Sequence, residues 1–297
     1  VGTLCGTSSG HLKNITISNT DVSGSNRTGG VCGTATSSEH CTVKHTSVNG
    51  DRNVGGVFGY TKEQSKCNTN ITDITVQDCS IHGEDHTGGA FGESGTNIQK
   101  IVVKDTVIYG NEIAGGICGQ SHSTNDIKQS HVNETLIQAE STIGGLIGKQ
   151  HTSDTVTVEN CSSNVELIGK TLIGGIGGKI SNCLIKNCTT IGNVIGQQTV
   201  AGFIAECDNV DVKYSFNNNT VTGHKNSAGF SCEFKDSTIY NTFSIPTEDS
   251  TLDSIIQLEK TCHIKNFLWS TETTDTDCST GTSIDSQNIK DFQSLLV

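Results

Sequence analysis

The chain has 297 residues, of which 32% are hydrophobic and 5% aromatic, and its formal net charge is −12 at pH 7. This acidic balance argues against nucleic acids and anionic membranes as partners, and no apolar run is long enough for direct membrane insertion. The apolar content is low for a globular core but sufficient for a narrow column of small aliphatic side chains. Because methionine is absent, we expect a processed chain or an excerpt of a longer one.

From the N-terminus onward, a glycine motif of the form Gly-Gly-hydrophobic-x-Gly recurs along the chain. Its copies close at positions 6, 33, 59, 92, 119, 148, 178, 205 and 232, which sets an interval of 26 to 33 residues. The first copy and the last two are degenerate. A fixed period in this range is typical of stacked units that cannot bury a core alone.

Between the glycine motifs, short stretches alternate apolar and polar residues, as half-buried strands do. Residues 15–20, 74–79, 101–106, 156–161 and 183–188 match one another. Each stretch leads to a residue that we expect to form a turn. These turn residues, aligned in one predicted column, are Asn19, Asp78, Asp105, Glu134, Asn160 and Asn187.

Three short strands and three turns in about 27 residues predict one coil of a parallel β-helix. The predicted fold is therefore all-β, a right-handed β-solenoid of about nine coils stacked about 4.8 Å apart. Residues 1–246 form this solenoid. Residues 247–297 lose the glycines and are expected to form a C-terminal cap with a short helix near residues 287–296. A propeller would need a longer repeat, of about 40 residues per blade.

Thirteen cysteines are many for a chain in a reducing compartment, and the repeat brings several of them together. The candidate disulfide pairs are Cys5 with Cys32, Cys41 with Cys67, Cys161 with Cys188, and Cys262 with Cys278. Stacked Cβ atoms about 4.8 Å apart are slightly too far for a disulfide, which needs about 3.8 Å. A ladder of buried free thiols is the alternative.

Seven N-glycosylation sequons occur, close to the number that the composition predicts by chance. Two of them, at Asn160 and Asn187, fall in the turn column, where we expect the side chain to contact backbone. The better candidates for glycosylation are Asn14, Asn26, Asn70, Asn133 and Asn218.

The stretch from Gly145 to Gly148, Gly-Leu-Ile-Gly, resembles the GLUG motif, and the other glycine motifs vary it. Residues 266–273 resemble the Asn-x-x-Trp-Asp-Thr-x-Thr element that ends such arrays, with Ser270 in the Asp position. Residues 283–296, with Gln287 and Lys290, resemble the short terminal helix of the family. The resemblance covers essentially the whole chain. It implies a large surface or secreted protein, an adhesin or a protease spacer, and no shared catalytic residues.

Two patterns invite a chemical interpretation. Asp78, Asp105 and Glu134 follow one another in the turn column, as acidic residues do in polysaccharide-active β-helix enzymes, although asparagines in that column favour a purely structural turn. A second set, with the types of residue that bind zinc, comprises His40, Cys41, His45 and Cys67. We expect no catalytic residue, metal or cofactor, because the cysteines have partners of their own and no catalytic motif is present.

These observations predict an extracellular or cell-surface structural protein, a rigid adhesive rod. The first residues lie inside a repeat, so an open coil edge is expected to favour self-assembly into filaments or a surface coat. Other surface proteins or glycans are the further partners. The alternative is a carbohydrate-active enzyme using Asp78, Asp105 and Glu134. An intracellular scaffold is the third possibility.

Overall fold

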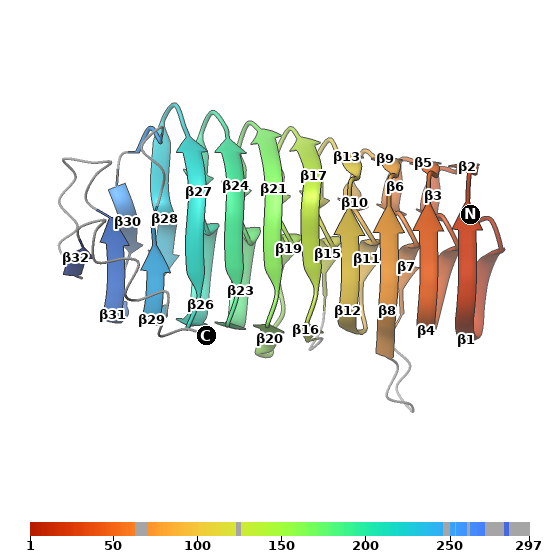
Figure 1. Ribbon diagram of the computed structural model, residues 1–297, viewed down its shortest axis with the longest axis horizontal. Coiled ribbons are helices and arrows are strands. Elements are labelled where there is room, and N and C mark those ends of the chain that lie inside the picture. Colours follow the sequence, from red (N-terminus) through yellow and green to blue (C-terminus); the bar gives the residue numbers. More distant parts are fainter. Residues whose placement is uncertain are drawn as a thin grey trace.

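The computed structural model describes residues 1–62, 70–122, 126–245, 250–252, 254–259, 262–270 and 282–284. In these residues the regular elements are strands, and no helix occurs. The strands form a parallel β-solenoid of about nine turns, so the predicted all-β fold class is confirmed. Figure 1 shows the layers side by side along the long axis, from β1 at the red end to β31 at the blue end.

The strands pair in three parallel stacks, and in the last coils the first stack continues on residues 231–235, 238–240 and 263–265, which belong to strands that also pair in another stack. The stack that follows the glycine motifs contains β1 (Cys5–Ser18), β4 (Cys32–Lys44), β7 (Phe58–Thr61), β8 (Asn70–Gln77), β11 (Phe91–Ser94), β12 (Asn97–Lys104), β15 (Cys118–Ser121), β16 (Ile127–Lys128), β19 (Ile147–Gln150), β20 (Val156–Glu159), β23 (Gly177–Lys186) and β26 (Ile204–Lys213). Where one coil has a single long strand, the coils in the middle have two short ones.

The second stack continues each coil after a sharp corner and contains β2 (Asp21–Ser23), β5 (Ser47–Asn49), β9 (Ser80–His82), β13 (Val107–Tyr109), β17 (His131–Ala139), β21 (Ser162–Gly169), β24 (Thr189–Ile195), β27 (Phe216–Thr222), β29 (Thr238–Ser244), β31 (His263–Ser270) and β32 (Thr282–Ile284). The third stack leads into the next glycine motif and contains β3 (Asn26–Gly29), β6 (Arg52–Gly55), β10 (His86–Gly88), β14 (Ile113–Gly115), β18 (Thr142–Gly144), β22 (Leu172–Gly174), β25 (Thr199–Ala201), β28 (Asn226–Lys235) and β30 (Ser254–Glu259).

Inside the coils, like residues stack on like residues, mainly valine and isoleucine. Aromatic rings follow the same rule: Phe58 and Phe91 stack with ring centroids 6.1 Å apart, and Phe203 and Phe230 with centroids 4.7 Å apart. Along each strand, these buried side chains alternate with side chains that point outward, as the apolar and polar residues of the sequence do. Burial of the apolar columns is the main favourable contribution to the stability of the fold.

The motif glycines are required by close approach of neighbouring coils. A Cβ on Gly116 would lie 2.1 Å from the carbonyl oxygen of Gly145, and one on Gly145 would lie 2.0 Å from that of Gly175. Among the glycines described, only Gly192 has a left-handed φ, of 131°. The motif therefore serves close packing of layers and not an unusual turn conformation.

Residues with positive φ form corner columns along the solenoid, some within strands and some between them, and nearly all of these residues are not glycine. The first corner column contains Asn14, His40, Asp73, Lys100, Gln129, Asn160, Asn187, Tyr214, Asn241 and Asn266. The second contains Asn19, His45, Asp78, Asp105 and Glu134, and a third contains Asn182, Asn209 and Asp236. A change of corner thus occurs near the sixth coil.

The single turn column predicted from the sequence is therefore wrong in part. Asn19, Asp78, Asp105 and Glu134 share one column, but Asn160 stacks on Gln129 in another, because β20 lies on β16. At Glu134 the pairing of β17 with β21 shifts by one residue, which ends the second column. Both stretches alternate and end in a left-handed residue, so a slip of one short strand leaves the local pattern unchanged.

Parallel pairing continues beyond residue 246, with β30 on β28 and β31 on β29. In β31, Phe267 and Trp269 are buried, and Phe267 packs edge-on against Phe230 at a centroid distance of 5.3 Å. The division at residue 246 stays a prediction. The expected helix cannot begin at Ser283, because that residue belongs to β32. Its remaining positions, with Gln287 and Lys290, lie outside the described residues.

Candidate functional site

The predicted acidic column forms a ladder of exposed corner residues. Asp78, Asp105 and Glu134 occupy neighbouring layers, as expected, and each has a positive φ near 50°. His45 in the preceding layer places its Nδ1 atom 3.7 Å from Asp78 Oδ2. The side chains project from a convex corner into solvent, so their positions suit a turn better than a site that surrounds a substrate.

Two of the four predicted cysteine pairs lie in register. Cys5 stacks on Cys32 with 2.8 Å between the Sγ atoms, which the structure shows as thiols. Burial and the adjacent Cys5 thiol raise the pKa of Cys32 to about 12. Cys161 and Cys188 follow stacked corner asparagines, and burial, with the Cys161 thiol beside it, raises the pKa of Cys188. Whether either pair is bonded in the protein stays a prediction.

The column argument for Cys41 and Cys67 fails, because Cys41 stacks between Ile15 and Ile74. The third repeat is longer than its neighbours, so counting residues from the preceding glycine does not give the register there. Cys67 itself and Cys278, the proposed partner of Cys262, lie outside the described residues. Cys67, which also belonged to the zinc-type set considered from the sequence, is therefore not placed either. The described part of the chain contains no group of three or more His, Cys, Asp or Glu residues suited to a metal.

The five candidate glycosylation sites lie on the outer surface of the strands and corners. Asn14, Asn26 and Asn70 are exposed, whereas Asn133 and Asn218 are partly exposed. The two sequons judged less suitable, at Asn160 and Asn187, bond to each other: the Asn187 amide donates to Asn160 Oδ1 over 3.1 Å. From the sequence we expected these side chains to contact backbone. In the structure they instead contact each other across two neighbouring layers.

The structure contains a cluster of polar and ionisable side chains that we did not predict from the sequence. His86 in β10 places Nδ1 2.9 Å from Asn53 Oδ1 and Nε2 3.3 Å from Asp85 Oδ1. The Asn53 amide donates to Glu93 Oε2 over 2.8 Å, and His122 Nε2 lies 3.1 Å from Glu93 Oε1. The cluster thus joins three successive coils. We call these five residues the His86 cluster.

The glycine motif brings the His86 cluster together. His86 precedes the motif and Glu93 follows it, so the turn between β10 and β11 lays the two side chains along one surface. At Gly92 a Cβ would lie 2.3 Å from the carbonyl carbon of Asn53, so this glycine allows β11 to lie against the preceding coil. The sequence could have indicated that His86 and Glu93 lie close together, because His86 lies two residues before Gly88 and Glu93 directly follows Gly92.

Burial lowers the pKa of His86, and the carboxylates of Asp85 and Glu93 only partly oppose that effect. Burial acts to raise the pKa of Glu93, but the hydrogen bond and charge of His122, together with His86 and the Asn53 amide, outweigh it and lower that pKa. The imidazole of His86 is therefore neutral at pH 7 and Glu93 is ionised. The cluster can take up a proton in mildly acidic solution, at a junction between layers.

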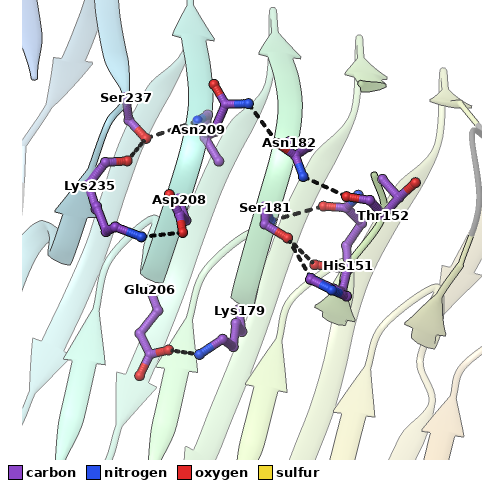
Figure 2. A network of polar contacts seen from close by, with 12 residues as sticks. His151, Thr152, Lys179, Ser181, Asn182, Glu206, Asp208, Asn209, Lys235 and Ser237 are labelled. Carbon is purple, nitrogen blue, oxygen red and sulfur yellow. Dashed lines mark hydrogen bonds and ion pairs between the residues drawn. The ribbon is translucent and has the colours of Figure 1, made fainter. Parts of the chain in front are cut away.

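A second polar network crosses β19, β23, β26 and β28, beside a surface groove of about 350 Å³ (Figure 2). Lys179 pairs with Glu206 and Lys235 pairs with Asp208, each across two neighbouring layers. The Asn209 amide also donates to Asn182 Oδ1 over 2.6 Å. These bonds connect layers in the way that cross-strand pairs stabilise a sheet, each contributing about 0.2–1 kcal/mol.

No family model matches the chain, and no curated protein matches it. Among the residues that the structure describes, no helix has the length and apolarity needed to cross a membrane.

Proposed function

We propose that the protein is an extracellular structural or adhesive rod that spaces, binds or assembles at a cell surface. The observation that carries this proposal is the continuous parallel pairing from β1 to β31, in which each layer lies on the next with only local shifts of register. Such a ladder resists bending because each coil is hydrogen-bonded to both neighbours. Its outward columns, rich in Ser, Thr and Asn, offer many hydrogen-bonding groups to partners.

We further propose that the repeats belong to the GLUG type. The resemblance is carried by the glycine column, and its Leu position, Leu146, is fully buried in the way a repeat core requires. The other copies have Val57 or Ile117 at that position, also fully buried. This interpretation agrees with an adhesin or spacer role and adds no catalytic residue.

Placement outside the cell is tested by labelling intact cells with antibodies raised against the solenoid. We expect labelling without permeabilisation, together with higher electrophoretic mobility before reduction than after it if any cysteine pair is bonded. Labelling only after permeabilisation, with every thiol free, would instead support an intracellular scaffold.

Assembly is tested separately by solution scattering and sedimentation over a wide range of protein concentration. The rod predicts a scattering curve of an elongated particle whose length increases with concentration as filaments or a coat form. If the particle keeps the length of one chain at the highest concentration, the self-assembly hypothesis is rejected. Binding to other surface proteins or glycans would then be the remaining role.

The enzyme alternative keeps one specific support, the stacking of Asp78, Asp105 and Glu134 in neighbouring layers. It predicts cleavage of an acidic or neutral glycan that is abolished by Asp105→Asn. The matched control is Asp236→Asn, at a corner of the third column. A glycan screen without cleavage would reject this alternative.

A further inference from the structure

The outer face of the last coils carries aromatic and cationic side chains close together. Lys213, Tyr240 and Lys265 occupy the same register position in three successive layers, and Tyr214 follows Lys213 at the corner. The rings of Tyr214 and Tyr240 meet edge to face with centroids 5.7 Å apart, and Lys265 Nζ lies 5.6 Å from the Tyr240 centroid. We call these four residues the tyrosine–lysine patch.

Three members of the tyrosine–lysine patch, Lys213, Tyr240 and Lys265, line a groove of about 670 Å³ together with Thr238 and His263. Tyr214 is 43% exposed, one of few large apolar side chains in the described residues that solvent reaches to this extent. Burial of its ring would be favourable. In a chain of net charge −12 with 5% aromatic residues, composition alone does not explain this surface.

We propose that the tyrosine–lysine patch and its groove bind an acidic polysaccharide, a ligand class that specifies the proposed adhesive function and rests on it. The apolar faces of sugar rings pack on tyrosine rings, while sugar hydroxyls bond to polar groups at the ring edge. Lys213 and Lys265 donate charge-assisted hydrogen bonds to carboxylate or sulfate groups. Their position in a regular ladder matches a ligand whose acidic groups repeat along its length.

Carboxylates within the same surface favour a glycan over a nucleic acid. Asp211 Oδ2 lies 3.4 Å from Lys213 Nζ, and Asp211 also accepts a hydrogen bond from Thr238. In the two preceding layers, Lys186 Nζ lies 2.9 Å from Glu159 Oε1. Ionised carboxylates only accept hydrogen bonds, so they suit the hydroxyl donors of a sugar.

Binding is tested by titrating fluorescently labelled heparin, polygalacturonate, neutral dextran and single-stranded DNA into the whole chain at two salt concentrations. The double variant Lys213→Gln/Lys265→Gln and the single variant Tyr240→Ala probe the patch. Lys13→Gln is the matched control, because Lys13 stands in the same register column at the opposite end and also pairs with a carboxylate, Glu39.

We expect binding of heparin or polygalacturonate that weakens with salt, and a loss of affinity of about tenfold or more in each patch variant. Lys13→Gln should bind as the unmodified chain does, and dextran weakly or not at all. No binding of either acidic glycan, an equal loss in the control, or preferential binding of DNA would overturn the proposal. Scattering and cell-labelling results are independent of this site, so failure here leaves the rod function standing.

Discussion

The replacement Gly116→Ala tests whether the glycine column sets the distance between layers. An ideal Cβ on Gly116 lies 2.1 Å from the oxygen of Gly145, and real Cβ atoms stay at least 3.0 Å from such atoms. The two layers must therefore separate locally by about 0.9 Å, the difference between those distances. The new methyl group cannot avoid this contact by moving toward Val132, because a methyl carbon of Val132 lies 2.8 Å from the same Cβ.

That separation breaks hydrogen bonds between the two layers. Gly116 N donates to Gly144 O over 3.3 Å, and Ile117 N donates to Leu146 O over 2.8 Å. Two lost bonds cost about 1–3 kcal/mol, and the strain of an overpacked site adds about 1–3 kcal/mol. We expect the free energy of unfolding to fall by about 2–6 kcal/mol, the sum of these two effects.

Urea unfolding followed by far-ultraviolet circular dichroism measures the change, and amide hydrogen exchange locates it. Exchange should accelerate most at residues 115–119 and 144–148, on both sides of the new methyl group. Gly10→Ala is the matched control, because nothing lies within 4 Å of a Cβ at that glycine. If the two variants unfold at the same urea concentration, the glycine column does not set the layer distance.

Three further predictions concern the core, the His86 cluster and the first cysteine pair. Phe91→Ala should cost about 3–5 kcal/mol of unfolding free energy, because this buried ring stacks on Phe58; Phe91→Leu should recover most of it in the same urea assay. His86 has a lowered pKa in the folded chain, so the unfolded chain binds more protons between that value and about 6.5. Stability should therefore fall as pH drops below about 6.5, with a slope that His86→Gln reduces, and an unchanged slope would contradict the assignment. Cys5 and Cys32, whose sulfurs lie 2.8 Å apart, should be linked in peptide maps of oxidised protein, with Cys32→Ser as the control; two free thiols after oxidation would refute the pairing.

The cysteines show which kinds of pairing can be predicted from the sequence. Cys5 and Cys32 share a position within the glycine motif, so their stacking follows from the repeat itself. Cys41 was paired by counting from a glycine, and the longer third repeat makes that count fail, because Ile74 takes the neighbouring position. Register is therefore kept by apolar contacts between layers, such as Cys41 with Ile74, and not by the number of residues in a coil.

The sequence by itself determined the fold class, the number of coils and the identity of the inward columns, because a repeated pattern of glycine and alternating residues has one compact way to stack. Only the tertiary structure decided which corner each polar residue occupies, as the separation of Asn160 from Glu134 shows. It also decided that His86, Asn53 and Glu93 form one cluster, and that Tyr240 and Lys265 line one groove. The reason is physical: local patterns specify whether a residue faces in or out, whereas the register between layers depends on contacts between residues far apart in the chain.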